Sequence, residues 1–145
     1  MIFARLGWRL SFRFGRKGLQ ARVVSERALE EGEWIGYVQK IGEAPSHVAI
    51  AAIGYTHGLP RRIQKASYAF RRGQRIKYAA PPWMEICPLG LPADWKEILG
   101  EEVEILGPNV PPHELARAAG MVPEEFFVRL SLAIPRKILG SNEVR

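Results

Sequence analysis

Five residues between positions 47 and 62 have side chains that could act as an acid, a base or a phosphate ligand. His47 and His57 bracket an apolar run, Tyr55 lies beside His57, and Arg61 and Arg62 follow. A metal-independent ribonuclease needs a base, an acid and a cation near the scissile phosphate, and these residue types supply all three. Ten residues of strand would separate the two imidazoles by roughly 30 Å, so cleavage requires that the segment folds back or is helical.

Positive charge is concentrated in the first part of the chain. The sequence has 145 residues and a formal net charge of +6. Residues 1–84 contain 15 lysines and arginines against five glutamates, whereas residues 85–145 contain six basic residues against ten acidic ones. Such segregation is typical of a surface that binds a polyanion, and a solvated basic face without a partner is the alternative.

Several kinds of site have no support in the sequence. Cys87 is the single cysteine, which excludes an internal disulfide and a four-cysteine zinc site and favours a reducing, cytoplasmic location. Asp94 is the only aspartate, and the sequence contains neither a P-loop nor a G-x-G-x-x-G string. No apolar run approaches the 18 residues of a membrane span. We therefore expect no metal, no cofactor and no membrane partner.

An aromatic hairpin near the start of the chain is the first element that would position basic residues. Residues 8–14 and 19–23 alternate apolar and polar side chains, and the GRKG sequence between them favours a four-residue turn. This register sets Leu10 opposite Val23. The solvent face and tip of this hairpin then carry Arg9, Arg13, Arg16, Lys17 and Arg22.

A second hairpin is expected around the sequence RRGQR. Residues 64–70 and 76–78 would pair with Phe70 opposite Ile76, and Gly73 would take the positive-φ position of the turn. Tyr68 and Tyr78 would pack inside, which leaves Tyr55 as the free ring. The basic residues on and before this hairpin are Arg61, Arg62, Lys65, Arg71, Arg72, Arg75 and Lys77.

The segments between and after the hairpins have weaker patterns. Residues 26–33 predict a short helical turn, residues 34–41 a strand with a bulge at Gly36, and residues 47–55 a buried strand rather than a short helix. Four prolines make residues 79–92 a packed connector without a continuous ladder. Residues 94–99 predict one or two helical turns, and 101–106 a strand or the end of a helix.

Two helices separated at Gly120 are expected at the end of the chain. Their spacing resembles a helix-turn-helix, but Glu124 and Glu125 would repel phosphates at the start of the second helix. The pair is therefore expected to pack on the core or to contact protein, with Phe126 and Phe127 as anchors.

The combined interpretation is an α+β protein. An antiparallel, curved β-hairpin sheet in residues 1–84 forms a basic unit, and residues 85–145 form a proline-rich connector and a small helical unit packed on it. The leading hypothesis is a non-catalytic nucleic-acid-binding protein that holds RNA or DNA phosphates with the basic residues named above and Tyr55. The alternatives are a protein-interaction subunit without nucleic acid and the His47–His57 ribonuclease. Scarce Asn, Gln and Cys indicate a heat-adapted source.

Overall fold

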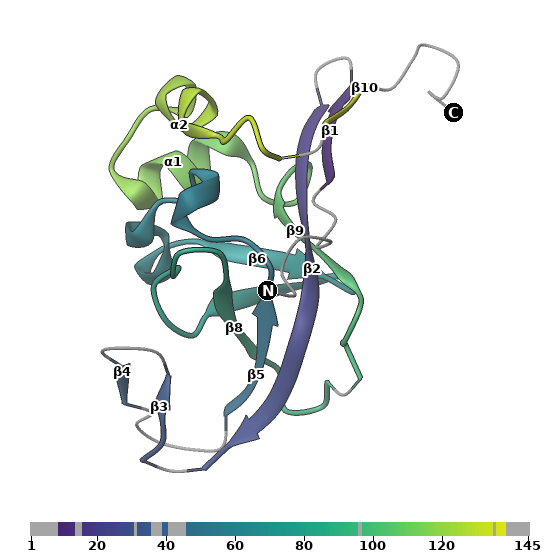
Figure 1. The fold of residues 1–145 in the computed structure, drawn as a ribbon, viewed down its shortest axis with the longest axis vertical. Helices are drawn as coiled ribbons and strands as arrows, with labels where there is room; N and C mark the ends of the chain where they lie inside the picture. The colour runs from purple at the N-terminus through teal and green to yellow at the C-terminus, as the bar shows by residue number, and fades with distance from the viewer. Residues whose placement is uncertain are drawn as a thin grey trace.

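A closed ring of antiparallel strands forms the centre of the molecule in the computed structural model (Figure 1). The structure describes residues 9–13, 16–30, 32–35, 39–40, 46–95, 97–134 and 136–138. In order around the ring, the strands are β2 (Arg16–Leu29), β5 (Ser46–Ala51), β8 (Cys87–Leu91), β7 (Gln74–Tyr78), β6 (Tyr68–Arg71) and β9 (Glu102–Leu106).

Strand β9 makes the sheet a barrel rather than an open sheet. It pairs with β2 along residues 102–106 and with β6 through Phe70 and Glu104. The mixed α+β class is confirmed, but the predicted curved hairpin sheet is wrong because the ring closes. Closure removes the exposed strand edges that an open sheet would leave, and the strand that closes it lies after residue 100, far from both hairpins in the sequence.

The first hairpin exists with a different register. Strand β1 (Arg9–Arg13) pairs with β2 so that Leu10 faces Leu19, not Val23, and Arg13 faces Arg16. The connection is therefore two residues long, the commonest length for hairpins, instead of four. The shift of four residues keeps the same side chains on each face, since the period of a strand is two. Strand β10 (Arg136–Ile138) adds to β1 in parallel.

The long strand β2 replaces the predicted helical turn. It continues to Leu29, which pairs with Ser46 of β5, so residues 26–29 are extended. The Glu26 carboxylate accepts a hydrogen bond from the Ile98 amide at 2.8 Å, which fixes the loop between β8 and β9 to this strand. Two short strands, β3 (Trp34–Ile35) and β4 (Gln39–Lys40), form a separate pair (Figure 1). The predicted bulge at Gly36 lies outside the described residues.

The second hairpin is also confirmed with a corrected register. Phe70 faces Arg75 and Ala69 faces Ile76, a shift of one residue from the predicted pairing. Arg72 and Gly73 form the turn with φ of 50° and 76°. Two successive positive φ values suit the twist of a tight hairpin better than the five-residue loop that we expected.

A strand crosses the proline-rich connector. The prediction that residues 79–92 form no continuous ladder is wrong, because β8 pairs with β5 over residues 87–91. Pro88 is tolerated there because its carbonyl serves the ladder: it accepts a hydrogen bond from the Ala79 amide at 2.9 Å. The predicted strand at 47–55 is confirmed for residues 46–51, whereas residues 94–99 contain no helix in their described part.

Short helices cover one side of the barrel (Figure 1). The helices α1 (Pro112–Ala119) and α2 (Pro123–Arg129) are separated at Gly120 as predicted, with φ of 72° at that glycine. Phe126 is fully buried and anchors the pair to the core. The 3-10 helices η1 (Tyr55–His57) and η2 (Arg61–Lys65) precede β6, and η2 contacts α1. Within the described residues, no helix has the length and apolarity needed to cross a membrane.

Candidate functional site

A tight turn after strand β5 presents Tyr55 at the surface. The chain leaves β5 through buried residues and enters η1 at Tyr55. Gly54 is required there because a Cβ atom would collide with the backbone carbonyls of Trp83 and Met84. Gly58 ends the turn with φ of 95°, and a Cβ at this position would collide with the Arg129 carbonyl. Two glycines thus let the turn lie directly against two distant segments of backbone.

Hydrogen bonds fix the turn to both of those segments. The Tyr55 amide donates to the Trp83 carbonyl at 2.8 Å, and the Thr56 amide and hydroxyl donate to the Met84 carbonyl at 2.9 and 2.7 Å. On the other side, the Ser131 amide donates to the His57 carbonyl at 3.1 Å. The position of the Tyr55 backbone is therefore determined by three parts of the chain that are far apart in sequence.

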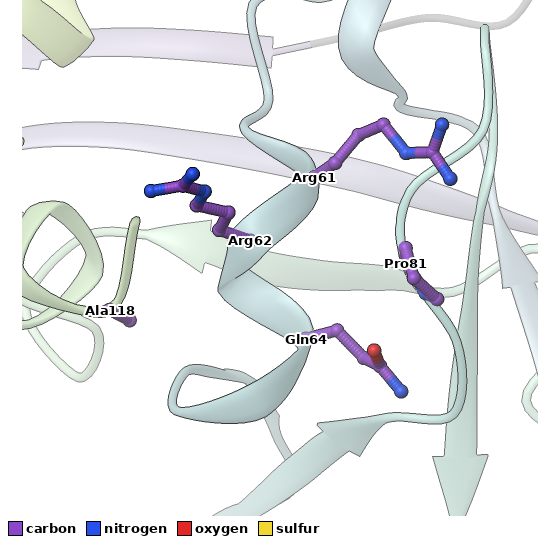
Figure 2. Close-up of a pocket in the computed structure, with 5 residues that line it drawn as sticks. All are labelled: Arg61, Arg62, Gln64, Pro81 and Ala118. Carbon is purple, nitrogen blue, oxygen red and sulfur yellow. The ribbon is translucent and has the colours of Figure 1, made fainter. Parts of the chain in front are cut away.

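The Tyr55 side chain is open to solvent and lies next to a cation. It is 41% exposed, and the Arg61 guanidinium carbon lies 5.9 Å from the centroid of its ring. Arg61 and Arg62 are both exposed and form no ion pair with the described residues. Figure 2 shows their side chains leaving η2 in opposite directions, Arg61 on the side of Pro81 and Arg62 on the side of Ala118.

A shallow pocket of about 360 Å³ lies along η2. Its lining consists of Arg61, Arg62, Gln64, Pro81 and Ala118 (Figure 2). Most of the lining surface is apolar, but Arg61, Arg62 and Gln64 carry hydrogen-bond donors, which suit an anionic or carbonyl-bearing group. Arg61 connects this pocket with Tyr55, because it lines the pocket and also lies over the Tyr55 ring.

His57 is a neutral, half-buried member of the same turn. Its Nδ1 accepts a hydrogen bond from the Gly54 amide at 3.2 Å, which places the ring proton on Nε2. Burial lowers the pKa of His57, and this effect outweighs the opposing influence of the nearby Glu85 carboxylate. The ring therefore stays neutral at neutral pH.

His47 does not join His57. Its Nδ1 donates to the Trp95 carbonyl at 3.0 Å, at the start of β5, whereas His57 follows the end of that strand. The two imidazoles bind different backbone groups. The histidine pair that the ribonuclease hypothesis requires is not assembled.

The arginines of the second hairpin are bound by the molecule itself. Arg71 Nε donates to Glu101 at 3.0 Å, and Arg72 binds the other oxygen of the same carboxylate. Arg72 also lies 5.4 Å from the Trp95 ring centroid, and Arg75 lies 4.2 Å from that of Tyr68. The hydrogen bond from Arg72 holds the pKa of Glu101 below its usual value, and Arg71 adds to this against the opposing effect of burial.

The remaining predicted contact residues are dispersed or lie outside the description. Arg22 is exposed on β2 and pairs across the strands with Glu102, and Lys77 is exposed on β7. The side chains of Arg9, Arg13, Arg16, Lys17 and Lys65 lie outside the described residues.

Metal chemistry has no site in the described part of the chain. No group of three or more His, Cys, Asp or Glu side chains converges there. Cys87 is fully buried, and burial raises the pKa of its thiol far above the usual value, so it is inert.

Two exposed apolar residues beside the turn were not predicted. Met84 is 57% exposed and its carbonyl binds Thr56, and Leu132, 84% exposed, follows the residue that binds His57. Neither residue belongs to an alternating or helical sequence pattern that would predict its exposure. The sequence feature that could have indicated contact with the turn is the pair of glycines that flank Tyr55–His57, because glycine allows a close approach of backbone.

The chain is similar to one known family over most of its length. The family model "Alanine racemase, C-terminal domain" matches residues 17–138. An alanine racemase from Alteromonas mediterranea is 31% identical over 119 residues, which are 81% of this chain and 33% of that protein. One from Pseudomonas taetrolens is 32% identical over 123 residues, 84% of this chain and 34% of that protein. The chain thus spans about a third of the length of the curated relatives it matches.

Solved alanine racemases share the fold. The enzyme from D-cycloserine-producing Streptomyces lavendulae has a TM-score of 0.79 and 26% identity, with 88% of this chain and 34% of that one covered. The biosynthetic enzyme from Pseudomonas aeruginosa has a TM-score of 0.79 and 26% identity over 86% of this chain and 35% of that one. The Bartonella henselae enzyme, described with covalently bound pyridoxal phosphate, has a TM-score of 0.79 at 23% identity over 85% and 35%.

These matches contradict the function inferred from the sequence. The nucleic-acid-binding hypothesis, its RNA or DNA partner and its two alternatives are wrong, because the matching proteins are racemases. The matches give no support to a heat-adapted source either, and that inference is withdrawn. The error has a physical cause: charge was counted along the chain, whereas arginines such as Arg71 and Arg72 are paired by a glutamate from the acidic half.

Proposed function

Because the chain belongs to the alanine racemase C-terminal domain family, we propose that it acts as this domain in an enzyme that interconverts the two enantiomers of alanine. The match over residues 17–138 supports the assignment. The activity, substrate and cofactor of the whole enzyme are parts of the proposal, since the chain covers about a third of its relatives. The cytoplasmic location expected from the single cysteine is also kept as a proposal.

The exposed phenol of Tyr55 is the observation that carries the proposal. Racemisation removes a proton from one face of the substrate Cα and returns a proton to the opposite face, so an acid–base group is needed on each side. Tyrosine is one of the side chains that can serve. Tyr55 is exposed while its backbone is fixed directly by the Trp83 carbonyl and, through Thr56 and His57, by Met84 and Ser131. Its hydroxyl would give or take the proton on one face.

The neighbouring arginines have a supporting role in this proposal. Arg61 lies over the Tyr55 ring and restricts the directions in which the phenol can point. Arg61 and Arg62 are exposed guanidinium groups, which bind carboxylates through paired hydrogen bonds. They would attract the carboxylate of an amino acid to the edge of the domain that carries Tyr55.

The cofactor does not fit the described residues by themselves. Pyridoxal phosphate is covalently bound in the Bartonella henselae enzyme; in the whole enzyme it would supply an electron sink, and a lysine side chain would hold it. The pocket along η2 is lined by two arginines, a glutamine, a proline and an alanine, with no lysine among them. We therefore place the cofactor in the rest of the whole enzyme and assign this domain the Tyr55 side of the site.

Replacement of the Tyr55 hydroxyl tests the proposal. In the full-length enzyme, Tyr55→Phe is expected to lower kcat for alanine racemisation by about 10²- to 10⁴-fold, the usual contribution of a general acid–base group. Exchange of the Cα proton with deuterated water should be lost for one enantiomer and retained for the other. A Tyr55→Phe enzyme with normal turnover would contradict the role of Tyr55.

Tyr68→Phe is the matched control. Tyr68 also lies under an arginine, but its hydroxyl donates inside the molecule, to Glu114 at 2.8 Å and to the Asn109 carbonyl at 3.1 Å. The same chemical change should therefore leave kcat nearly unchanged. An equal loss in both variants would indicate a general loss of structure.

A further inference from the structure

The turn that carries Tyr55 is closed by a reciprocal pair of contacts around Gly54. The Gly54 amide donates to His57 Nδ1 at 3.2 Å, and the Gly54 carbonyl accepts from the His57 amide at 3.1 Å and from the Leu59 amide at 3.3 Å. Gly54 is buried. Its amide is therefore a buried donor whose acceptor is an imidazole nitrogen.

The His57 ring accepts a hydrogen bond from the peptide between Ile53 and Gly54. The next peptide, between Gly54 and Tyr55, contains the Tyr55 amide, which donates to the Trp83 carbonyl at 2.8 Å. If His57 no longer accepted this bond, the buried Gly54 amide would have no hydrogen-bond partner, one residue before the amide that attaches Tyr55 to Trp83. The direction of the Tyr55 side chain depends on the same backbone, because the backbone conformation at a residue sets the direction of its Cα–Cβ bond.

From this geometry we propose that His57 is a positioning residue for Tyr55, which holds the phenol in place while its ring is neutral and releases the turn when the ring takes up a proton. The inference rests on the proposed function of Tyr55. A protonated imidazole has donors on both nitrogens, so Nδ1 can no longer accept from the Gly54 amide.

The charged groups around the turn do not remove this sensitivity. Glu85, in the segment that binds the turn, favours the protonated ring, but burial has the larger effect and lowers the pKa of His57. Arg61 from η2 lies over the Tyr55 ring. From α2, the Arg129 carbonyl faces Gly58, while the Arg129 guanidinium pairs with Glu125 at 2.7 Å.

The direction of the pH effect follows from the lowered pKa. The unfolded ring titrates near pH 6.5 and the folded ring titrates below it. The unfolded state therefore binds more protons in the interval between the two values, so stability of the turn is full above about pH 6.5 and falls as the pH drops through the folded pKa. Release of Tyr55 is expected on the acidic side only.

Two substitutions in the full-length enzyme separate positioning from packing. His57→Asn puts an amide oxygen near the position of Nδ1. The Gly54 amide then keeps an acceptor that does not change its protonation state over the pH range of the experiment. His57→Ala removes the acceptor. We expect kcat of the Ala variant to fall by about ten- to a hundredfold with a smaller change in KM, the effect of a misplaced reacting group. The Asn variant should recover most of kcat at pH 8 and should lose the acidic decline that His57 causes.

Hydrogen exchange of the Gly54 amide gives a readout that is independent of activity. After correction for the intrinsic rate, exchange should be fast at every pH in His57→Ala, fast only at acidic pH in the wild type, and slow throughout in His57→Asn. The inference is overturned if the wild type and His57→Asn have the same acidic decline in kcat and the same Gly54 exchange. If the Ala variant does not fold, the comparison of wild type with His57→Asn decides alone.

A failure of the proposed function has a different signature. If Tyr55→Phe turns over normally, Tyr55 has no catalytic role and the positioning role of His57 is overturned with it, whatever Gly54 exchange shows. If Tyr55→Phe is inactive but kcat of the wild type and of His57→Asn vary alike with pH, the proposed function stands and the inference about His57 is wrong.

Discussion

The turn at Tyr55–His57 and the hairpin tip at Arg71–Gly73 each end at a glycine with positive φ, yet the molecule uses their side chains differently. At the tip, both arginines bind Glu101, and Arg72 also lies over Trp95. At the turn, the backbone makes the attachments and the Tyr55 side chain remains exposed. Attachment through the backbone leaves a side chain available for chemistry, whereas attachment through side chains uses it.

The comparison also explains why net charge misled the functional inference. Arg71 and Arg72 are about 30 residues from Glu101 in the sequence, in a segment of opposite net charge. The barrel brings them together. A basic segment therefore predicts a polyanion partner only when its own chain supplies no acid at the same place.

Alanine substitution of one glycine in each region should give the largest difference between them. Gly58 has φ of 95° and no room for a Cβ next to Arg129, so Gly58→Ala is expected to lower the free energy of unfolding by about 3 kcal/mol or more. Gly73 has φ of 76° with open space around it, so Gly73→Ala should cost only about 1–2 kcal/mol. Calorimetry on the full-length enzyme measures both, and equal losses would show that the turn is not closely packed.

Removal of one tyrosine hydroxyl should have a smaller effect on stability and should separate the two regions again. Tyr68→Phe loses the hydrogen bonds to Glu114 and Asn109, so it is expected to cost about 1–2 kcal/mol. Tyr55→Phe should leave the unfolding transition unchanged, because this ring is exposed. Thermal unfolding of the two variants, followed beside their kcat, tests whether stability and turnover are affected by different tyrosines.

The smallest effect is expected at the ion pairs of the tip. Glu101→Gln removes a carboxylate whose pKa is lowered by the hydrogen bond from Arg72. Its stabilising contribution is present above about pH 4.5 and is lost as the pH falls through the lower folded pKa, and salt should screen it because the arginines are exposed. Melting temperatures of the wild type and Glu101→Gln should therefore converge in acid and in high salt. A constant difference would mean that Glu101 acts through packing instead.

Local patterns in the sequence identified many of the elements. Strict alternation located the first hairpin, the RRGQR turn located the second, and Gly120 marked the end of the first helix because a left-handed residue is needed there. Registers were wrong because they depend on turns of two residues, which alternation does not specify. The helical turn at 26–33 was wrong because pairing with β5 extends β2 to Leu29, in the middle of that segment.

The candidate site was only partly accessible from the sequence. Tyr55 was identified as the exposed ring, and His57, Arg61 and Arg62 as residues with suitable chemistry. Their association with residues 83–84 and 131 was not predictable, because backbone hydrogen bonds between distant segments leave no side-chain pattern.

The sequence by itself determined that two hairpins and a helix pair form and which residues can exchange protons or bind anions, since these follow from local periodicity, turn residues and side-chain chemistry. Tertiary structure alone decided that the sheet closes, that the arginines of the hairpin tip are paired with Glu101, and that the Tyr55 turn is held by residues 83–84 and 131. Those outcomes depend on contacts between residues far apart in the chain, and only folding brings such residues within the few ångströms over which hydrogen bonds and ion pairs act.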